Sequence, residues 1–131
     1  MFRTICTITL TVLLMFLIVI ANVRWRQQTQ FQAGERGALA GDFMLALTGY
    51  ESAIRMYLPF SETVETASAR IWVMGETAEK RGDIERALIA YRSLRSALYG
   101  VGWLQQPGKE WIARCDLKIA ALKPLRKGMV P

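Results

Sequence analysis

Two ten-residue segments of this chain repeat one pattern at a spacing of 41 positions. Residues 41–50 read GDFMLALTGY and residues 82–91 read GDIERALIAY, so Gly, Asp, Ala, Leu and Tyr recur in register. Upstream, Gly34 recurs as Gly75 at the same spacing. A repeat of this length indicates stacked helical hairpins, a kind of fold that presents surfaces to partners rather than a site for chemistry.

The hydrophobic pattern that follows each Gly-Asp pair has the period of a helix. Apolar residues recur at i, i+3, i+4 and i+7, which predicts one buried stripe per helix; they are Phe43, Ala46, Leu47, Tyr50, Ile54 and Tyr57, and then Ile84, Ala87, Leu88, Tyr91, Leu94 and Leu98. Asp42, Asp83 and Ser61 are suitable N-caps. A final helix is expected from about Gly108 to Leu122. No segment shows sustained period-two alternation, so the fold is predicted to be all-α.

The first quarter of the chain has the composition of a membrane span. Thr4–Val23 contains twenty residues without a charge, and about twenty residues of helix cross a hydrocarbon core of about 30 Å. Arg24-Trp25-Arg26 then forms an interfacial anchor. No Pro or Gly intervenes before Gly34, so the span is expected to continue into the first helix of the domain. The alternative is a signal peptide cleaved after Ala21, although the apolar run is longer than the apolar region of a signal peptide, which usually has about 7–15 residues.

The chain therefore divides into four parts. Residues 1–3 form a short N-terminal tail, residues 4–23 a transmembrane helix, residues 24–122 the helical domain and residues 123–131 a basic, flexible tail. The domain is expected to contain two hairpins and a C-terminal capping helix. With only two cysteines, one of them in the membrane segment, no disulfide framework is expected.

The spacing within the hairpins resembles the tetratricopeptide (TPR) repeat. A small residue is followed by Gly after seven positions, Ala after five more and an aromatic after four more: Gly34, Gly41, Ala46, Tyr50, and again Gly75, Gly82, Ala87, Tyr91. The resemblance covers residues 28–100, and the whole chain is similar to small bacterial membrane-anchored proteins with TPR-like repeats. Its period of 41 differs from the TPR length of about 34. The usual aromatic partway along the first helix is replaced by Gly37 and Ala78.

The resemblance implies a groove lined by the first helix of each repeat. The residues it assigns to that groove are Phe31, Glu35, Trp72, Glu76, Glu79 and Lys80. An aromatic and acidic groove favours a partner segment that is apolar and basic. The alternative is that Phe31 and Trp72 pack between the hairpins.

Two further surfaces are candidates for contact. One is a stripe of the membrane helix that suits helix–helix packing, including homo-oligomerisation: Thr4, Thr7, Thr11, Met15, Ile18 and Asn22. The alternative is that the threonine hydroxyls bond to carbonyls of their own helix and face lipid. The other is a loop with Trp103 and Leu104 between glycines and Pro107, either an exposed anchor or a segment folded over the last two helices.

Features of catalysis and of nucleic-acid binding are missing from the sequence. The chain has no histidine, the commonest general base and a frequent metal ligand, and no metal, nucleotide or nucleophile motif. No enzyme activity, cofactor or metal is expected. All eleven acidic residues and fourteen of the seventeen Lys and Arg follow position 26, so this part carries only about +3. Nucleic acid is therefore not an expected partner.

The sequence predicts a single-pass protein of the bacterial inner membrane that docks a partner protein near the bilayer. Arg24 and Arg26 on one side of the span against Arg3 on the other slightly favour a cytoplasmic domain. One alternative is a small accessory subunit of a membrane complex that acts through its transmembrane helix. The other is a periplasmic or secreted module after signal cleavage.

Overall fold

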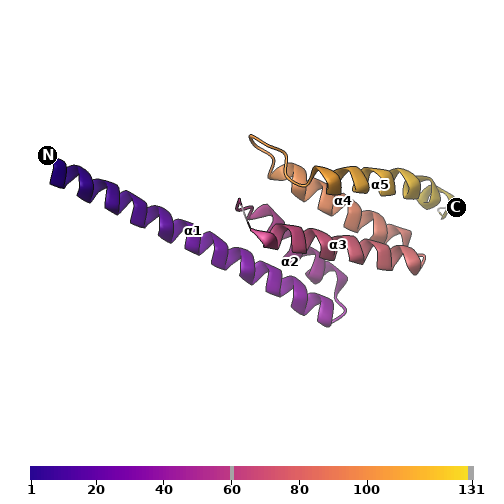
Figure 1. Ribbon diagram of the computed structural model, residues 1–131. Coiled ribbons are helices and arrows are strands. Elements are labelled where there is room, and N and C mark those ends of the chain that lie inside the picture. The colour runs from indigo at the N-terminus through magenta and orange to yellow at the C-terminus, as the bar shows by residue number, and fades with distance from the viewer. Residues whose placement is uncertain (60, 130–131) are drawn as a thin grey trace.

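The computed structural model describes residues 1–59 and 61–129, and five helices account for most of them (Figure 1). They are α1 (Phe2–Leu39), α2 (Phe43–Arg55), α3 (Glu62–Lys80), α4 (Ile84–Gly100) and α5 (Lys109–Met129). The described residues contain no strand. The predicted all-α class is therefore confirmed.

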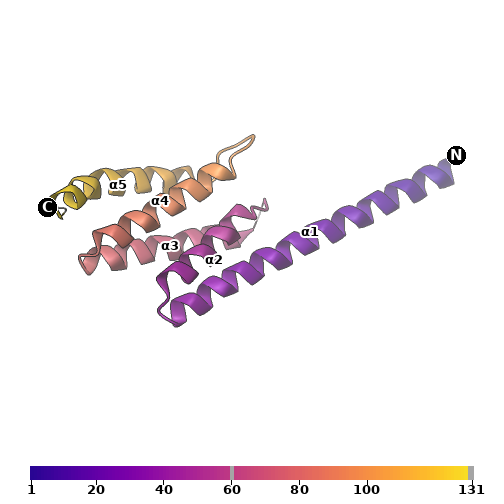
Figure 2. The same ribbon diagram turned by 180° about the vertical axis from the view of Figure 1, so that it is seen from behind.

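The two parts of helix α1 have different surroundings. Its C-terminal part packs against α2 and α3, whereas its N-terminal part extends away from the other helices, as Figures 1 and 2 show from opposite sides. The most apolar 18-residue window of α1 has no buried residue. The expected continuity between the apolar segment and the first helix of the domain is confirmed. The helix is long and apolar enough to cross a membrane.

The repeated Gly-Asp pairs form two matching turns. Gly41 and Gly82 adopt φ values of 71° and 76°, a left-handed conformation that glycine reaches without steric cost. The next residue's amide then donates to a carbonyl five positions back, Asp42 to Gly37 and Asp83 to Ala78, each at 2.9 Å. The two Asp carboxylates accept from the amides of Leu45 and Arg86 and so cap α2 and α4.

The repeated glycine and tyrosine are in contact in both hairpins. A methyl group on Gly34 would lie 2.7 Å from Cδ1 of Tyr50, and one on Gly75 would lie 2.6 Å from Cε1 of Tyr91. Glycine is needed because carbon atoms pack at about 3.5–4.0 Å. Each tyrosine ring also meets an aromatic one turn before the glycine: Phe31 at 5.5 Å and Trp72 at 4.9 Å between centroids. The two hairpins therefore share one packing arrangement.

The first hairpin is packed more closely than the second. Gly37 and Gly49 occupy positions that are Ala78 and Ala90 in the second hairpin. A methyl group on Gly37 would lie 2.5 Å from the Ala46 nitrogen, and one on Gly49 would overlap the backbone of Gly34. Backbone thus meets backbone between α1 and α2.

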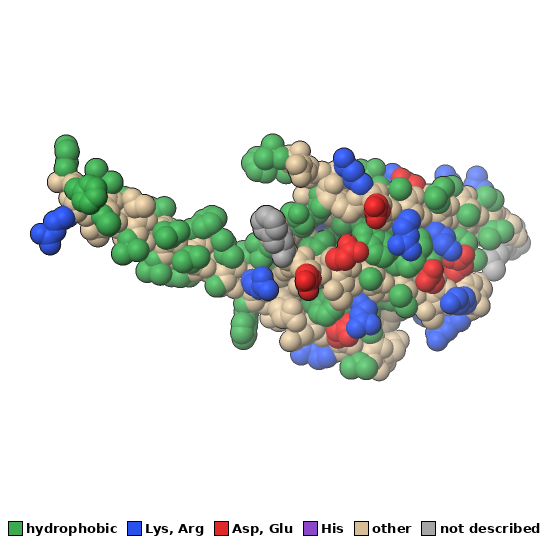
Figure 3. Space-filling model, in the orientation of Figure 1, with side chains coloured by type: hydrophobic (Ala, Val, Ile, Leu, Met, Phe, Trp, Pro, Cys, Tyr) green, Lys and Arg blue, Asp and Glu red, His purple; other side chains and the backbone are tan. Residues whose placement is uncertain are grey.

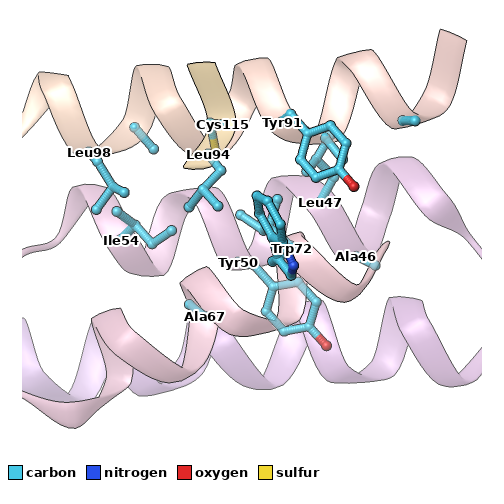
Figure 4. Packing of buried hydrophobic residues seen from close by; sticks show 14 of the residues in the cluster. Ala46, Leu47, Tyr50, Ile54, Ala67, Trp72, Tyr91, Leu94, Leu98 and Cys115 are labelled. Atoms are coloured by element: carbon cyan, nitrogen blue, oxygen red, sulfur yellow. The ribbon is translucent and has the colours of Figure 1, made fainter. Parts of the chain in front are cut away.

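The core lies between the hairpins and beneath α5. Figure 4 shows its central side chains, which include Tyr50, Trp72 and Tyr91. From α5, Ile112, Cys115 and Leu122 are buried against this cluster.

Helix α5 is longer than predicted. It continues through Pro124 to Met129, so residues 123–129 are helical where a flexible tail was expected; residues 130–131 lie outside the described part. Two physical features favour the longer helix. Arg126 lies 3.7 Å from the Glu85 carboxylate of α4, and Arg126 and Lys127 in the last turn offset the negative end of the helix dipole.

Substitution of Gly49 tests the close approach of α1 and α2. We expect Gly49→Ala to lower the free energy of unfolding by about 2 kcal/mol, because the added methyl group meets backbone atoms that cannot move aside. Gly128→Ala is the matched control, since no atom of the described residues lies within 4 Å of its methyl position. It should leave stability unchanged or raise it by up to about 1 kcal/mol. Equal unfolding temperatures for the two full-length variants in detergent would contradict this packing.

Candidate interaction surface

Two of the residues assigned to the groove pack against the repeat tyrosines. Phe31 is partly buried against Tyr50, and only 7% of Trp72 is exposed. Helix α5 covers Trp72, because Trp111 packs at 5.9 Å between ring centroids and the Arg114 guanidinium lies 4.3 Å from the Trp72 ring. Trp72 therefore presents little surface for a partner in this conformation.

Glu35 lies where three helices meet. Its carboxylate accepts a 2.7 Å hydrogen bond from the Tyr50 hydroxyl of α2 and pairs at 2.9 Å with Arg70 Nε of α3. Burial, with help from Glu35, raises the pKa of the Tyr50 hydroxyl, which stays protonated and acts as a donor. Glu35 thus links α1, α2 and α3.

Glu79 forms the corresponding cluster in the second hairpin. It accepts from the Tyr91 hydroxyl of α4 at 3.0 Å and pairs with Lys118 Nζ of α5 at 2.8 Å. The hydrogen bond from Lys118 holds the pKa of the Glu79 carboxyl below its usual value. Each repeat tyrosine therefore bonds to a glutamate that is paired with a cation from a further helix.

The remaining two groove candidates lie apart from these clusters. Glu76 is partly buried on α3, and Lys80 is exposed in the last turn of that helix. Glu76 lies 41 positions after Glu35 and so has the equivalent place in the second repeat, but the Tyr91 hydroxyl bonds to Glu79 instead. The partners Arg70 and Lys118 were not predicted, because they lie 35 and 39 positions from their glutamates. The acidic character expected for the groove is therefore partly neutralised by the protein itself.

Gln27 lies on α1 close to the apolar segment and connects this helix to α2 and α3. Its side chain is 1% exposed. Its amide nitrogen donates to the carbonyls of Ala53 and Met56 at the end of α2, and its oxygen accepts from the Ser61 hydroxyl at the start of α3. No sequence pattern indicated this role. One buried side chain thus joins the end of α2 and the beginning of α3 to α1.

A cleft of about 280 Å³ opens between the turn of the first hairpin and the second hairpin. Its lining is mostly apolar, with charged residues from the turns: Ala38, Gly41, Asp42, Phe43, Ala46, Val73, Met74, Thr77, Ala78, Arg81, Asp83 and Arg86. Asp42 and Asp83 are occupied as helix caps, and Arg86 lies over the Phe43 ring. Val73 is 55% exposed although it is apolar. The cleft is therefore a mostly apolar recess that opens to the surface between the two hairpins.

The stripe on the apolar part of α1 is exposed along its length. Thr4, Met15, Ile18 and Asn22 all lie on the surface of this helix. The hydroxyls of Thr7 and Thr11 donate to the carbonyls of Arg3 and Thr7, at 2.7 and 2.9 Å. These hydroxyls are satisfied within the helix, so any contact along the stripe uses shape rather than interhelical hydrogen bonds from these two groups.

The described residues hold no cluster of three or more potential metal ligands. Cys115 is fully buried, and burial raises the pKa of its thiol to about 11. The thiol is therefore protonated at neutral pH and packs as a small apolar side chain.

The Glu79 cluster predicts a pH-dependent contribution to stability. The pKa of Glu79 is lowered on folding, so its stabilising effect is complete above the unfolded-state pKa and is lost as the pH falls through the folded-state value. We expect Glu79→Gln to lower the free energy of unfolding by about 1 kcal/mol at neutral pH and by much less in acid. Glu85→Gln, at an exposed and longer ion pair, is the control. A loss from Glu79→Gln that is equal at both pH values would contradict this role.

Comparisons of the chain with protein-family models, with curated proteins and with solved structures found no match.

Proposed function

We propose that this chain is a single-pass membrane protein whose helical domain docks a protein partner near the bilayer. The observation that carries the proposal is the division of α1: one half is apolar and free of contacts with the domain, and the other is built into it. A span that continues as a domain helix holds the domain close to the membrane with little freedom to swing. In the absence of histidine, we infer a binding role rather than catalysis.

We further propose that the two hairpins are TPR-like. The support is the equivalence of the repeat residues: Gly41 and Gly82 in the turns, and Gly34 and Gly75 beneath the tyrosines. The period of 41 residues is accommodated by the connection between α2 and α3 and by the lengths of the helices. Helix α5 then caps the second hairpin and covers Trp72.

The cleft between the hairpins is the surface to which we assign the partner. Its apolar lining, with Val73 and Met74, suits a bulky apolar side chain. The groove glutamates Glu35 and Glu79 are engaged with Arg70 and Lys118, so they offer less to a basic segment than the sequence predicted. Shape and apolar contact in the cleft are therefore proposed as the main source of affinity.

Filling the cleft tests this assignment. A photo-reactive residue in place of Val73 should give one discrete cross-linked product in cells, whereas the same residue at Leu117, an exposed apolar position on α5, should not. Thr77→Arg should abolish the product because Thr77 lines the cleft. Thr66→Arg, an exposed threonine on the same helix outside the cleft, should preserve it. Retention of the product in Thr77→Arg, with the unfolding temperature unchanged, would overturn the assignment.

A second candidate is a small accessory subunit of a membrane complex that acts through its transmembrane helix. It is favoured by the exposure of the whole stripe from Thr4 to Asn22. Replacing Thr4–Val23 by a poly-Leu span separates the two functions. The docking proposal expects the cross-link from position 73 to survive, whereas its loss, with the domain still in the membrane, would support the accessory-subunit function.

We place the protein in the bacterial inner membrane with the domain on the cytoplasmic side, following the excess of Arg24 and Arg26 over Arg3. The remaining alternative is a secreted or periplasmic module released by cleavage after Ala21. N-terminal sequencing of the protein isolated from cells distinguishes them, because an uncleaved anchor retains the residues before Ala21.

A further inference from the structure

The two ends of the helical domain differ in the charge of the connections between their helices. The α1–α2 and α3–α4 turns lie at the end remote from the apolar half of α1, and the α2–α3 and α4–α5 connections lie at the near end (Figures 1 and 2). The remote turns contain Asp42, Arg81 and Asp83. The described residues of the near connections, 56–59 with 61 and 101–108, include no charged residue. The end of the domain nearest the apolar helix is thus the end whose connections lack charge.

The α4–α5 loop exposes two large apolar side chains. Trp103 is 91% exposed and Leu104 is 83% exposed. In the space-filling view of Figure 3, apolar side chains of this loop project from the domain on the side of the apolar half of α1. Trp103 and Leu104 therefore do not fold back over the last two helices, which was one of the two arrangements considered from the sequence.

The shape of the loop is fixed by hydrogen bonds at its base. The Gln106 amide nitrogen donates to the carbonyls of Leu98 and Pro107 at 2.7 and 3.1 Å. The Gly102 amide donates to the Tyr99 carbonyl at 3.2 Å. These bonds hold both ends of the loop in place, and Trp103 and Leu104 lie between them at the exposed tip. Exposed apolar groups held in this way are typical of a contact site.

We propose that Trp103 and Leu104 insert into the interfacial layer of the same bilayer that α1 spans. This inference rests on the membrane anchoring proposed above. Trp25, which is 77% exposed and flanked by Arg24 and Arg26, marks the level at which α1 leaves the hydrocarbon core. Tryptophan favours this layer because its ring is apolar and its indole N–H can still reach water or headgroups.

The pattern of charge around the loop fits a lipid surface. The first charged residues after the tip are Lys109 and Glu110, which begin α5, and Arg55 ends α2 at the same end of the domain. At this end of the domain, charged groups thus begin with the helices, Glu62 of α3 included, and the two near connections carry no charge. A second contact of this kind would stop the domain from rotating about α1 and would leave the turns that line the cleft on the side away from the bilayer.

The test measures whether lipid reaches the loop tip. The full chain with Cys6→Ser is labelled with an environment-sensitive fluorophore at Gln105→Cys, beside the intact tip, and is reconstituted in phosphatidylcholine–phosphatidylglycerol vesicles. Buried Cys115 is protected from the reagent. Trp25→Cys is the membrane reference, and Leu39→Cys, 88% exposed at the remote end, is the aqueous reference. Quenching by lipid-bound nitroxide and by aqueous iodide is compared for each label.

We expect the emission of the label at position 105 to be blue-shifted and to be quenched by the lipid nitroxide, as at position 25. The label at position 39 should show the aqueous pattern, in which iodide quenches the emission and the lipid nitroxide does not. The double change Trp103→Ser and Leu104→Ser should shift the position 105 label to the aqueous pattern. An aqueous pattern at position 105 in the intact tip, with position 25 in lipid, overturns the inference but leaves the anchor. Shielding from both quenchers would indicate a protein contact and also overturn it. If the lipid nitroxide does not quench the label at position 25, the result contradicts the proposal that α1 anchors the chain in the membrane.

Discussion

The close packing of α1 on α2 determines where every other part of the molecule lies. Gly37 and Gly49 bring the two backbones into direct contact, and Gly34 leaves room for the Tyr50 ring. Gln27 adds hydrogen bonds to the end of α2 and to the cap of α3. Because α1 also carries the exposed apolar segment, this contact fixes the orientation of the whole domain relative to that segment. A shift of α1 would move the cleft and the loop tip together.

The second hairpin repeats the main contacts of the first, with two substitutions at the contact between its helices. Gly75 admits Tyr91 as Gly34 admits Tyr50, and both tyrosine hydroxyls bond to glutamates of the preceding helix. Ala78 and Ala90 replace two glycines, so the helices of this hairpin have side chains at these two contact positions. The glutamates then pair with cations of the following helices, which converts a local repeat into links along the whole domain.

Local patterns predicted the elements of this fold well, but not the contacts between distant ones. The turns and caps at Asp42 and Asp83, and the buried stripes of α2 and α4, follow from spacing within a few residues. Tyr57 is the exception, because α2 ends at Arg55 and this side chain is 39% exposed. The pairing of Glu79 with Lys118, and the cover that Trp111 and Arg114 provide over Trp72, depend on where α5 docks. No local pattern encodes that position. The end of α5 was also missed, because the interaction of Arg126 with Glu85 joins residues far apart in the sequence.

The central claim is that one rigid helix joins the membrane segment to the domain. It is tested most directly by the distance between spin labels at Leu13 and Arg92, both exposed positions, in the Cys6→Ser protein in lipid nanodiscs. A continuous α1 packed on α2 predicts a single narrow distance distribution. A broad distribution or several separate distances would show that the domain moves relative to the span and would contradict the account.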